Sequence, residues 1–364
     1  MLIVILDVSL TNIQKQYNLY MKKRWNEAKK TIRINHPIYH HTFKKNSFNK
    51  ETGPAGDYTI YTNSLGFKDK SSRTIPASSP NERIVFIGDS FTEGVALNYK
   101  DTFVGIIDSV LSERGIEVLN AARASYSPII YWKKIKYLIE DEGLKINKLV
   151  VFLDISDVQD EALYYSDDQG IVIKNKNVGK DQEIERKKVD KLIYLKDAIW
   201  RNTTVMAPVL NFVHDLIGFD QVNSAEKMDR PNSNFSERSL WTLTYNSNSE
   251  WVEKGLKEMK KYMNKLLEIT QKNNIELSIA VYPWPAQIIF DDLNSIHVRI
   301  WYNYCLKNNI KFINLFPLFI DVKSTSEDKL GVVRKYYLRD GVHFNKRGNE
   351  LISEKFLYNF FNDS

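Results

Sequence analysis

The sequence predicts an α/β protein with a parallel sheet between two layers of helices. Short apolar runs alternate with helical segments over residues 84–153, and a similar alternation returns over residues 248–315. Strands that alternate with helices form parallel sheets, because each helix carries the chain back to the same end of the sheet. The chain has 364 residues, which is enough for one large domain or two small ones.

Five apolar runs are long enough to serve as strands of this sheet. They are residues 84–87, 116–120, 149–153, 277–282 and 311–315. The third run is apolar throughout, as expected of a strand that helices cover on both faces. The sequence therefore predicts a five-stranded parallel sheet.

Capping residues mark the helices between these strands. Asp101 precedes a helical segment that ends before Gly115, and Ser127-Pro128 places a capping serine and a first-turn proline at the start of the next helix. Further helices are predicted over residues 248–272, 297–307 and 346–361.

Two segments depart from the alternation. Residues 1–78 are interpreted as an N-terminal extension, and residues 161–247 as an inserted cap, so the predicted core comprises 79–160 and 248–364. Within the two segments we expect a basic helix (14–33), strands and turns (37–69), a short hairpin strand (171–173), an amphipathic helix (189–219) and a polar loop (223–237).

Composition and residue spacing limit which ligands and partners the sequence predicts. The 51 Lys and Arg residues against 45 Asp and Glu residues give a formal net charge of +6, which permits an anionic partner without requiring one. The chain lacks zinc-finger spacing and a Walker loop, so no nucleic-acid partner is predicted. Cys305 is the only cysteine, which excludes a disulfide within the chain. The histidines have no ligand-like spacing, and no metal is predicted.

The first residues leave the location open. Residues 1–6 are apolar, but Asp7 interrupts the run, which is too short to span a membrane. The run also lacks the basic start and the cleavage site of a signal peptide. Cytoplasmic and cell-envelope locations, and membrane association, therefore all remain open.

A serine follows the first predicted strand. Gly88-Asp89-Ser90 places the Ser90 hydroxyl at the carboxyl edge of the sheet, where open α/β sheets bind ligands. Near the other end of the chain, Asp340 and His343 lie three residues apart. A serine nucleophile needs a base, an imidazole titrates near neutral pH, and a carboxylate can fix its tautomer. These are the components of a Ser-His-Asp triad.

Together the two motifs resemble the SGNH/GDSL hydrolase superfamily, in which a Gly-Asp-Ser block supplies the nucleophile and an Asp-x-x-His block the acid and base. The resemblance implies a three-layer α/β/α fold of flavodoxin-like order, with Ser90 as nucleophile, His343 as base and Asp340 as its orienting partner. An alternative interpretation of the second motif is that Asp340 caps the following helix and His343 lies on the surface in its first turn.

The resemblance also assigns an oxyanion site. The family uses the N–H of the nucleophile, a glycine and an asparagine, and the last two positions are occupied here by Ser125 and Ser156. The expected donors are the N–H groups of Ser90 and Ser125, with the Ser156 hydroxyl. A backbone N–H survives the change from Gly to Ser unless the backbone there requires a positive φ. The alternative for Ser156-Asp157 is a simple turn after the strand.

Other polar and aromatic residues are expected at the same edge of the sheet. They are Asp89, Asp154, Asp157, Tyr282 and Trp284. An aromatic side chain at this edge can stack on a sugar, and the alternative is a rigid, packed loop.

These observations predict a serine esterase that uses no cofactor and forms an acyl-enzyme on Ser90. The resemblance suggests an O-acetyl ester of a cell-surface glycan as substrate, and a small acyl group fits a site lined by Ser and Ala. Two alternatives stay open. One is an O-acyltransferase that passes the acyl group to a sugar, and the other is a glycan-binding protein without turnover. A lipase, suggested by the amphipathic helix of the insertion, is a weaker hypothesis.

Overall fold

The computed structural model describes residues 16, 32–175, 237–245, 250–321 and 325–362. Apart from residue 16, these residues belong to one compact unit, formed by Thr31–Asn175 and Asn234–Ser364. The amphipathic helix expected over 189–219 lies outside the described residues, as do almost all of the segments expected over 14–33 and 223–237.

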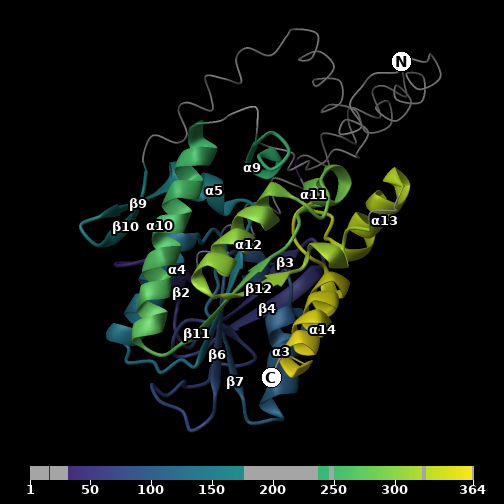
Figure 1. Cartoon of the computed structure of the whole chain (residues 1–364). Helices are drawn as coiled ribbons and strands as arrows, with labels where there is room; N and C mark the ends of the chain where they lie inside the picture. Colours follow the sequence, from purple (N-terminus) through teal and green to yellow (C-terminus); the bar gives the residue numbers. More distant parts are fainter. Residues whose placement is uncertain (1–15, 17–31, 176–236, 246–249, 322–324, 363–364) are drawn as a thin grey trace, which may run out of the picture. The chain divides into compact units, whose positions relative to one another are not determined.

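A mixed eight-stranded sheet forms the centre of this unit (Figure 1). Its strands, in spatial order, are β12 (Lys311–Asn314), β11 (Glu276–Val281), β8 (Lys148–Leu153), β6 (Arg83–Ile87), β7 (Glu117–Asn120), β5 (Lys68–Asp69), β4 (Gly56–Thr62) and β3 (Phe48–Gly53). The first five run parallel and coincide with the five predicted strands. β6 and β8 are buried almost throughout, which explains their unbroken apolar sequences.

The sheet is three strands wider than the sequence predicts. β5, β4 and β3 come from the N-terminal segment and continue the sheet in antiparallel fashion beyond β7, where Lys68 pairs with Asn120. These strands cover an edge of β7 that would otherwise present unpaired backbone groups. A strand of two residues such as β5 shows no periodicity, so the sequence pattern could not reveal this junction. The division into extension, core and cap stays a prediction.

Helices cover both faces of the sheet. α3 (Phe103–Ser112) packs on α14 (Lys346–Asn362), α4 (Pro128–Glu140) packs on α10 (Glu250–Lys272), and the two pairs lie on opposite sides (Figure 1). α12 (Ile296–Asn308) packs on β11 and β12. This is the predicted three-layer α/β/α architecture.

The aromatic residues of β6 and β8 join the sheet to the α3–α14 layer. The ring centroids of Phe86 and Phe152 lie 6.2 Å apart, Phe103 of α3 lies 4.6 Å from Phe152, and Phe356 of α14 lies 5.1 Å from Phe86. All four side chains are buried. Aromatic burial of this kind contributes strongly to the core.

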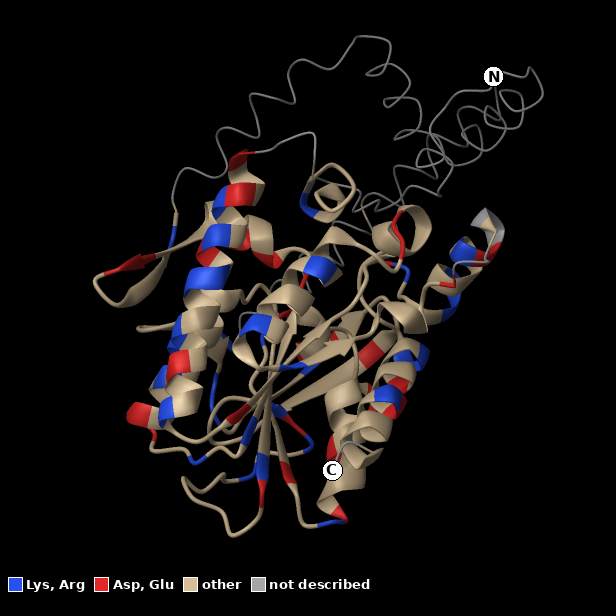
Figure 2. Cartoon of the chain, viewed as in Figure 1, with Lys and Arg blue, Asp and Glu red and all other residues tan. Residues whose placement is uncertain are grey.

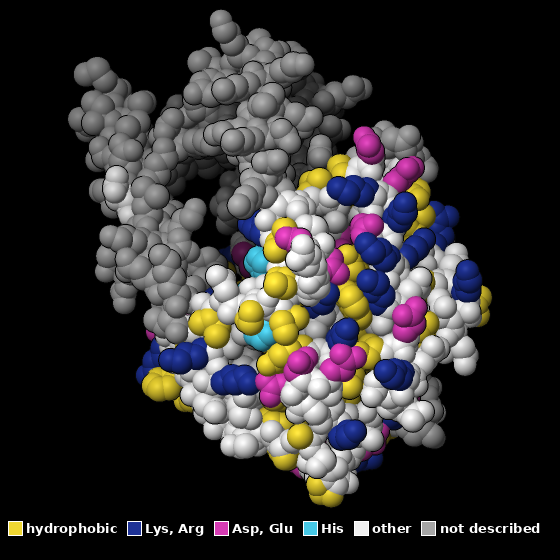
Figure 3. Space-filling view, turned by 90° about the vertical axis from the view of Figure 1, so that its left-hand side faces the viewer, with side chains coloured by type: hydrophobic (Ala, Val, Ile, Leu, Met, Phe, Trp, Pro, Cys, Tyr) yellow, Lys and Arg dark blue, Asp and Glu magenta, His cyan; other side chains and the backbone are white. Residues whose placement is uncertain are grey.

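Charge separates the two faces of α10. Its buried side includes Leu256, Met259, Met263 and Leu266, whereas basic and acidic residues line the remaining surface (Figure 2). Such an amphipathic pattern predicts a helix that packs on the core along one stripe. Figure 3 shows Lys and Arg side chains scattered among acidic and hydrophobic ones on one face of the molecule. None of the described helices is long and apolar enough to cross a bilayer.

Two helix caps differ from the prediction. Thr102, and not Asp101, caps α3, since its hydroxyl oxygen accepts the N–H of Gly105 at 3.1 Å. Ser127 precedes α4 as predicted, but it makes no capping hydrogen bond of its own. The carboxylate of Glu161 caps α4 instead, accepting the Ile129 N–H at 2.6 Å.

The remaining elements are two hairpins and several short helices. The hairpins are β1 (Arg33–His36) with β2 (His40–Phe43), and β9 (Tyr165–Asp168) with β10 (Ile171–Lys174). The short helices are α2 (Ser90–Glu93), η1 (Tyr99–Asp101), α5 (Asp157–Gln159), η2 (Asp160–Tyr164), α9 (Glu237–Leu240), α11 (Pro285–Phe290), η6 (Phe316–Leu318) and α13 (Ser326–Tyr336).

Candidate active site

Ser90 is the first residue of α2, directly after β6. The Asp89 carboxylate caps this short helix by accepting the Phe91 N–H at 3.0 Å. Gly88 is required before it, because a Cβ at that position would lie 2.3 Å from the Thr92 hydroxyl oxygen. In the Gly-Asp-Ser sequence, Gly88 thus allows the close approach to Thr92, Asp89 caps the helix, and Ser90 is the one partly exposed residue of a turn that is otherwise buried. This sequence places Ser90 at the carboxyl edge of the sheet, as predicted.

Asp340 and His343 form a hydrogen-bonded pair in the loop between α13 and α14. Oδ2 of Asp340 lies 2.6 Å from Nδ1 of His343, and Oδ1 accepts the N–H groups of Val342 at 2.9 Å and His343 at 3.1 Å. The alternative that Asp340 caps α14 is wrong, since α14 begins at Lys346. The Asp340 carboxylate instead accepts hydrogen bonds from two backbone N–H groups of its own loop and from the His343 ring.

His343 lies beside α2, the helix that begins at Ser90. Its ring centroid is 5.3 Å from that of Phe91, which follows Ser90 in the chain. Among the described residues, none forms a hydrogen bond with Nε2 of His343. The Ser90 hydroxyl donates to Oδ2 of Asp89 at 3.1 Å, and no hydrogen bond joins Ser90 to His343. Catalytic hydrogen bonds are often long in a ligand-free enzyme and shorten when substrate binds.

The surroundings favour the charged form of the imidazole. Burial disfavours imidazolium, but the hydrogen bond and charge of Asp340, together with the charges of Asp89 and Asp154, outweigh it and raise the pKa of His343. Burial likewise disfavours the Asp340 carboxylate, yet the hydrogen bond and charge of His343 lower the pKa of Asp340. The two shifts favour an ionised Asp340 carboxylate next to a protonated His343 ring.

The predicted acidic and aromatic residues meet behind Ser90. Tyr282 donates its hydroxyl to Asp154 at 2.7 Å and contacts Asp89 at 3.3 Å, and the Trp284 indole N–H donates to Asp154 at 2.7 Å. Burial and the neighbouring Asp154 raise the pKa of Asp89, and burial with Asp154 and Asp89 raises that of Asp157. Tyr282 is fully buried and Trp284 is 6% exposed, so the structure favours the packed, rigid loop over a sugar-stacking surface.

The two backbone donors expected for the oxyanion site are both available. Among the described residues, none accepts a hydrogen bond from the N–H of Ser90 or of Ser125. Ser125 has a φ of +64°, in the left-handed region that favours glycine, where the family motif carries glycine. Ser156 differs, because its buried hydroxyl and its N–H both donate to Oδ1 of Asp154. We therefore leave Ser156 out of the oxyanion site proposed below.

A buried ion network that the sequence analysis missed joins α2 to the loop that carries Ser125. Oε2 of Glu93, the last residue of α2, accepts Nη1 of Arg123 at 2.6 Å and the Ala124 N–H at 2.7 Å. Arg33 of β1 lies 3.9 Å from the same carboxylate. The only sequence signal was the glutamate in Gly-Asp-Ser-Phe-Thr-Glu-Gly, and nothing local distinguishes it from a surface residue.

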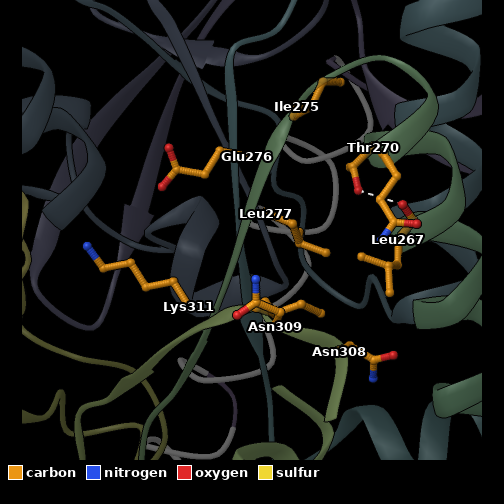
Figure 4. Close-up of a pocket in the computed structure, with 10 residues that line it drawn as sticks. Leu267, Thr270, Ile275, Glu276, Leu277, Asn308, Asn309 and Lys311 are labelled. Carbon is orange, nitrogen blue, oxygen red and sulfur yellow. Dashed lines mark hydrogen bonds between the residues drawn. The ribbon is translucent and has the colours of Figure 1, made fainter. Parts of the chain in front are cut away.

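A pocket, the possible metal ligands and the cysteine were also considered as functional features. The pocket in Figure 4 is lined by the amino ends of β11 and β12 and by Thr270 and Asn308, at the edge of the sheet opposite to Tyr282. Among the described residues, no three His, Cys, Asp or Glu side chains are arranged to hold a metal ion. Cys305 is buried, as expected of a core residue.

No family model matches the chain, and no curated protein sequence does. The chain is similar to a number of solved structures, three of which are described here. A psychrotrophic esterase from Pseudoalteromonas is 11% identical, covering 77% of this chain and 97% of its own, with a TM-score of 0.39. A protein assigned to the G-D-S-L lipolytic family from Desulfitobacterium hafniense is 14% identical, with 76% and 97% covered and a TM-score of 0.38. A variant of an acetylxylan esterase from Geobacillus stearothermophilus is 13% identical, with 78% and 95% covered and a TM-score of 0.40.

Proposed function

We propose that the protein is a serine esterase of the SGNH type. The observation that carries the proposal is the Asp340–His343 pair beside the helix that begins at Ser90, together with two backbone N–H groups that have no acceptor among the described residues. A nucleophile, an oriented base and oxyanion donors are the parts that acyl transfer requires.

The proposed reaction has two halves. Ser90 Oγ attacks the ester carbonyl while His343 Nε2 takes the hydroxyl proton, and the N–H groups of Ser90 and Ser125 hold the oxyanion. The bond from carbonyl carbon to alkoxy oxygen breaks, and the imidazolium returns the proton to the leaving alcohol. Water then attacks the acyl-enzyme in the same manner, releasing the acid and restoring Ser90.

The substrate that we propose is an O-acetyl ester on a carbohydrate. The aromatic side chains next to Ser90 pack on one another, with ring centroids of Phe91 4.8 Å from Tyr282 and 5.9 Å from Trp284. The side chains of Ala122 and Ser125 in the facing loop are small. This packing suits a short acyl group better than a fatty acyl chain.

A glycan-binding protein without turnover is the second candidate. The observation that favours it is the hydrogen bond from Ser90 to Asp89, which directs the hydroxyl proton toward a buried carboxylate and away from His343. An O-acyltransferase shares every step of the proposed reaction except that a sugar hydroxyl replaces water.

Initial rates with 4-nitrophenyl acetate, butyrate and octanoate test the proposal, followed by acetate release from O-acetylated xylan. We expect hydrolysis that falls with acyl length and drops at least about 1,000-fold in Ser90→Ala and His343→Ala. Ser109→Ala, an exposed serine on α3, is the matched control. Hydrolysis that persists in Ser90→Ala would contradict the proposal. Acetyl transfer to an added oligosaccharide in preference to water would favour the acyltransferase.

A further inference from the structure

His41 reaches from the N-terminal hairpin to the loop that carries Ser125. Nε2 of His41, on β2, lies 2.8 Å from the carbonyl oxygen of Ala124. That carbonyl and the Ser125 N–H belong to one peptide group, which is planar and holds its C=O and N–H in opposite directions. The ring that binds the carbonyl therefore fixes where the Ser125 N–H points.

Chemistry settles the tautomers of the two histidines in this contact. A carbonyl oxygen only accepts, so Nε2 of His41 carries the hydrogen. In a neutral ring, Nδ1 of His41 is then an acceptor, and the His40 Nδ1 that lies 2.7 Å away must be the donor. Burial and the charge of Arg123 lower the pKa of His41 to about 3, so the ring is neutral at ordinary pH.

The neighbouring backbone groups of this loop are held as well. Glu93 accepts the Ala124 N–H at 2.7 Å, Tyr165 donates to the Ser125 carbonyl at 2.8 Å, and Tyr126 donates to the His41 carbonyl at 2.6 Å. The left-handed conformation of Ser125 is strained for a residue other than glycine, so it persists only where surrounding contacts impose it. Within residues 124–126, only the Ser125 N–H has no acceptor among the described residues.

We infer that His41 is a positioning residue for the reaction proposed above. It aims the Ser125 N–H at the developing oxyanion, and its hydrogen bond to the Ala124 carbonyl polarises the same peptide group, which strengthens that N–H as a donor. The inference rests on the proposed function. It also gives the N-terminal hairpin a part in catalysis, because the histidine that acts on the loop comes from β2.

Replacing His41 by Gln or by Asn tests this inference, because both side chains are polar amides that differ in reach. The terminal nitrogen of Gln occupies about the place of Nε2, whereas the shorter Asn side chain ends near Nδ1 and cannot reach Ala124. For an acetate ester we expect kcat to fall about 10-fold to 100-fold in His41→Asn, with KM within about twofold, and to be largely restored in His41→Gln. The pH at which activity rises, set by His343, should be the same in both variants.

His41→Phe and His36→Phe extend the test on the same hairpin. His36 stacks on Tyr39 with ring centroids 3.5 Å apart, and a Phe there keeps the stacking while changing no contact to Ala124. We expect kcat to fall in His41→Phe as it does in His41→Asn, and to stay at the native value in His36→Phe. Circular dichroism ensures that the variants are compared at equal folded fraction. Equal kcat values for the Asn and Gln variants, or a fully active His41→Phe, would overturn the role of His41. A native protein without Ser90-dependent hydrolysis would instead overturn the proposed function itself.

Discussion

The Ser90 hydroxyl donates to the carboxylate of its neighbour Asp89 at 3.1 Å, while His343 stands beside the same short helix without a hydrogen bond to Ser90. Asp89 also caps that helix and contacts Tyr282. One buried carboxylate therefore shapes the turn that carries Ser90 and contributes charge to the environment of His343.

Asp89→Asn should lower the pH at which kcat/KM rises on the acid side of the pH–rate profile, here called the acid limb. The Asp89 charge helps to raise the pKa of His343, and the base works only when neutral, so removing that charge lets His343 lose its proton at a lower pH. We expect a shift of roughly half a pH unit to one unit. The Asn side-chain oxygen can still cap α2. A pH–rate profile checks this, and an acid limb that stays in place or moves upward would contradict it.

Asp340→Asn should lower kcat by about 100-fold to 10,000-fold and also move the acid limb to lower pH. The amide removes the charge that raises the pKa of His343 and offers an N–H where Nδ1 needs an acceptor. Steady-state kinetics across pH measure both effects. Asp141→Asn, an exposed residue at the end of α4, is the control, and equal losses in the two variants would argue against an orienting role for Asp340.

Glu93→Gln should destabilise the fold by about 3 kcal/mol or more, because it leaves Arg123 buried without its carboxylate partner and removes one of the two carboxylates beside Arg33, which keeps its ion pair with Glu51. Burial favours the neutral acid, but the charges of Arg123, Arg33 and Lys68 outweigh it and lower the pKa of Glu93 to about 2. The folded pKa lies below the unfolded value, so this stabilisation is present above about pH 4.5 and is lost as the pH falls toward 2.

Urea unfolding of the Glu93→Gln variant between pH 7 and pH 3 tests both statements. Glu140→Gln is the matched control, since Glu140 forms an exposed ion pair with Lys136 at 3.6 Å and should change stability by less than about 0.5 kcal/mol. Similar losses in the two variants at pH 7 would show that the buried network does not stabilise the fold as described.

Glu161→Gln should have the opposite effect on the dependence of stability on pH. Burial raises the pKa of Glu161 to about 8, above its unfolded value, so the native protein loses stability as the pH rises from about 4.5 toward 8. The Gln oxygen can accept from Ser127 and Ile129 as the carboxylate does. We expect the variant to be about 1–3 kcal/mol more stable than the native protein at pH 8 and similar at pH 4.5. Chemical denaturation of both proteins at the two pH values measures their free energies of unfolding. The same change with pH in both proteins would refute this account of Glu161.

Local sequence patterns predicted the five parallel strands and the place of Ser90 after β6. The apolar runs of β6, β7, β8, β11 and β12 are continuous enough to be recognised alone. A strand followed by Gly-Asp-Ser fixes the place of Ser90 without reference to the rest of the chain. Asp340 and His343, three residues apart in the sequence, are in contact, in the loop between α13 and α14.

What the sequence did not predict depends on contacts between distant residues. β5 pairs with β7 through residues 52 positions apart, and no local pattern encodes that partner. The adjacent His40 and His41 were considered only as metal ligands, since nothing nearby indicates that β2 lies against Ala124. Ser156 has a hydroxyl at the expected position, yet only the fold shows that Asp154 accepts its hydrogen.

Covalent labelling of Ser90 by a fluorophosphonate tests the central claim most directly. We predict one adduct per folded chain by intact mass, located on Ser90 by peptide mapping, abolished in Ser90→Ala and His343→Ala and unchanged in Ser109→Ala. A folded native protein that takes up no probe, or an adduct that persists in Ser90→Ala, would contradict the claim that Ser90 is an activated nucleophile.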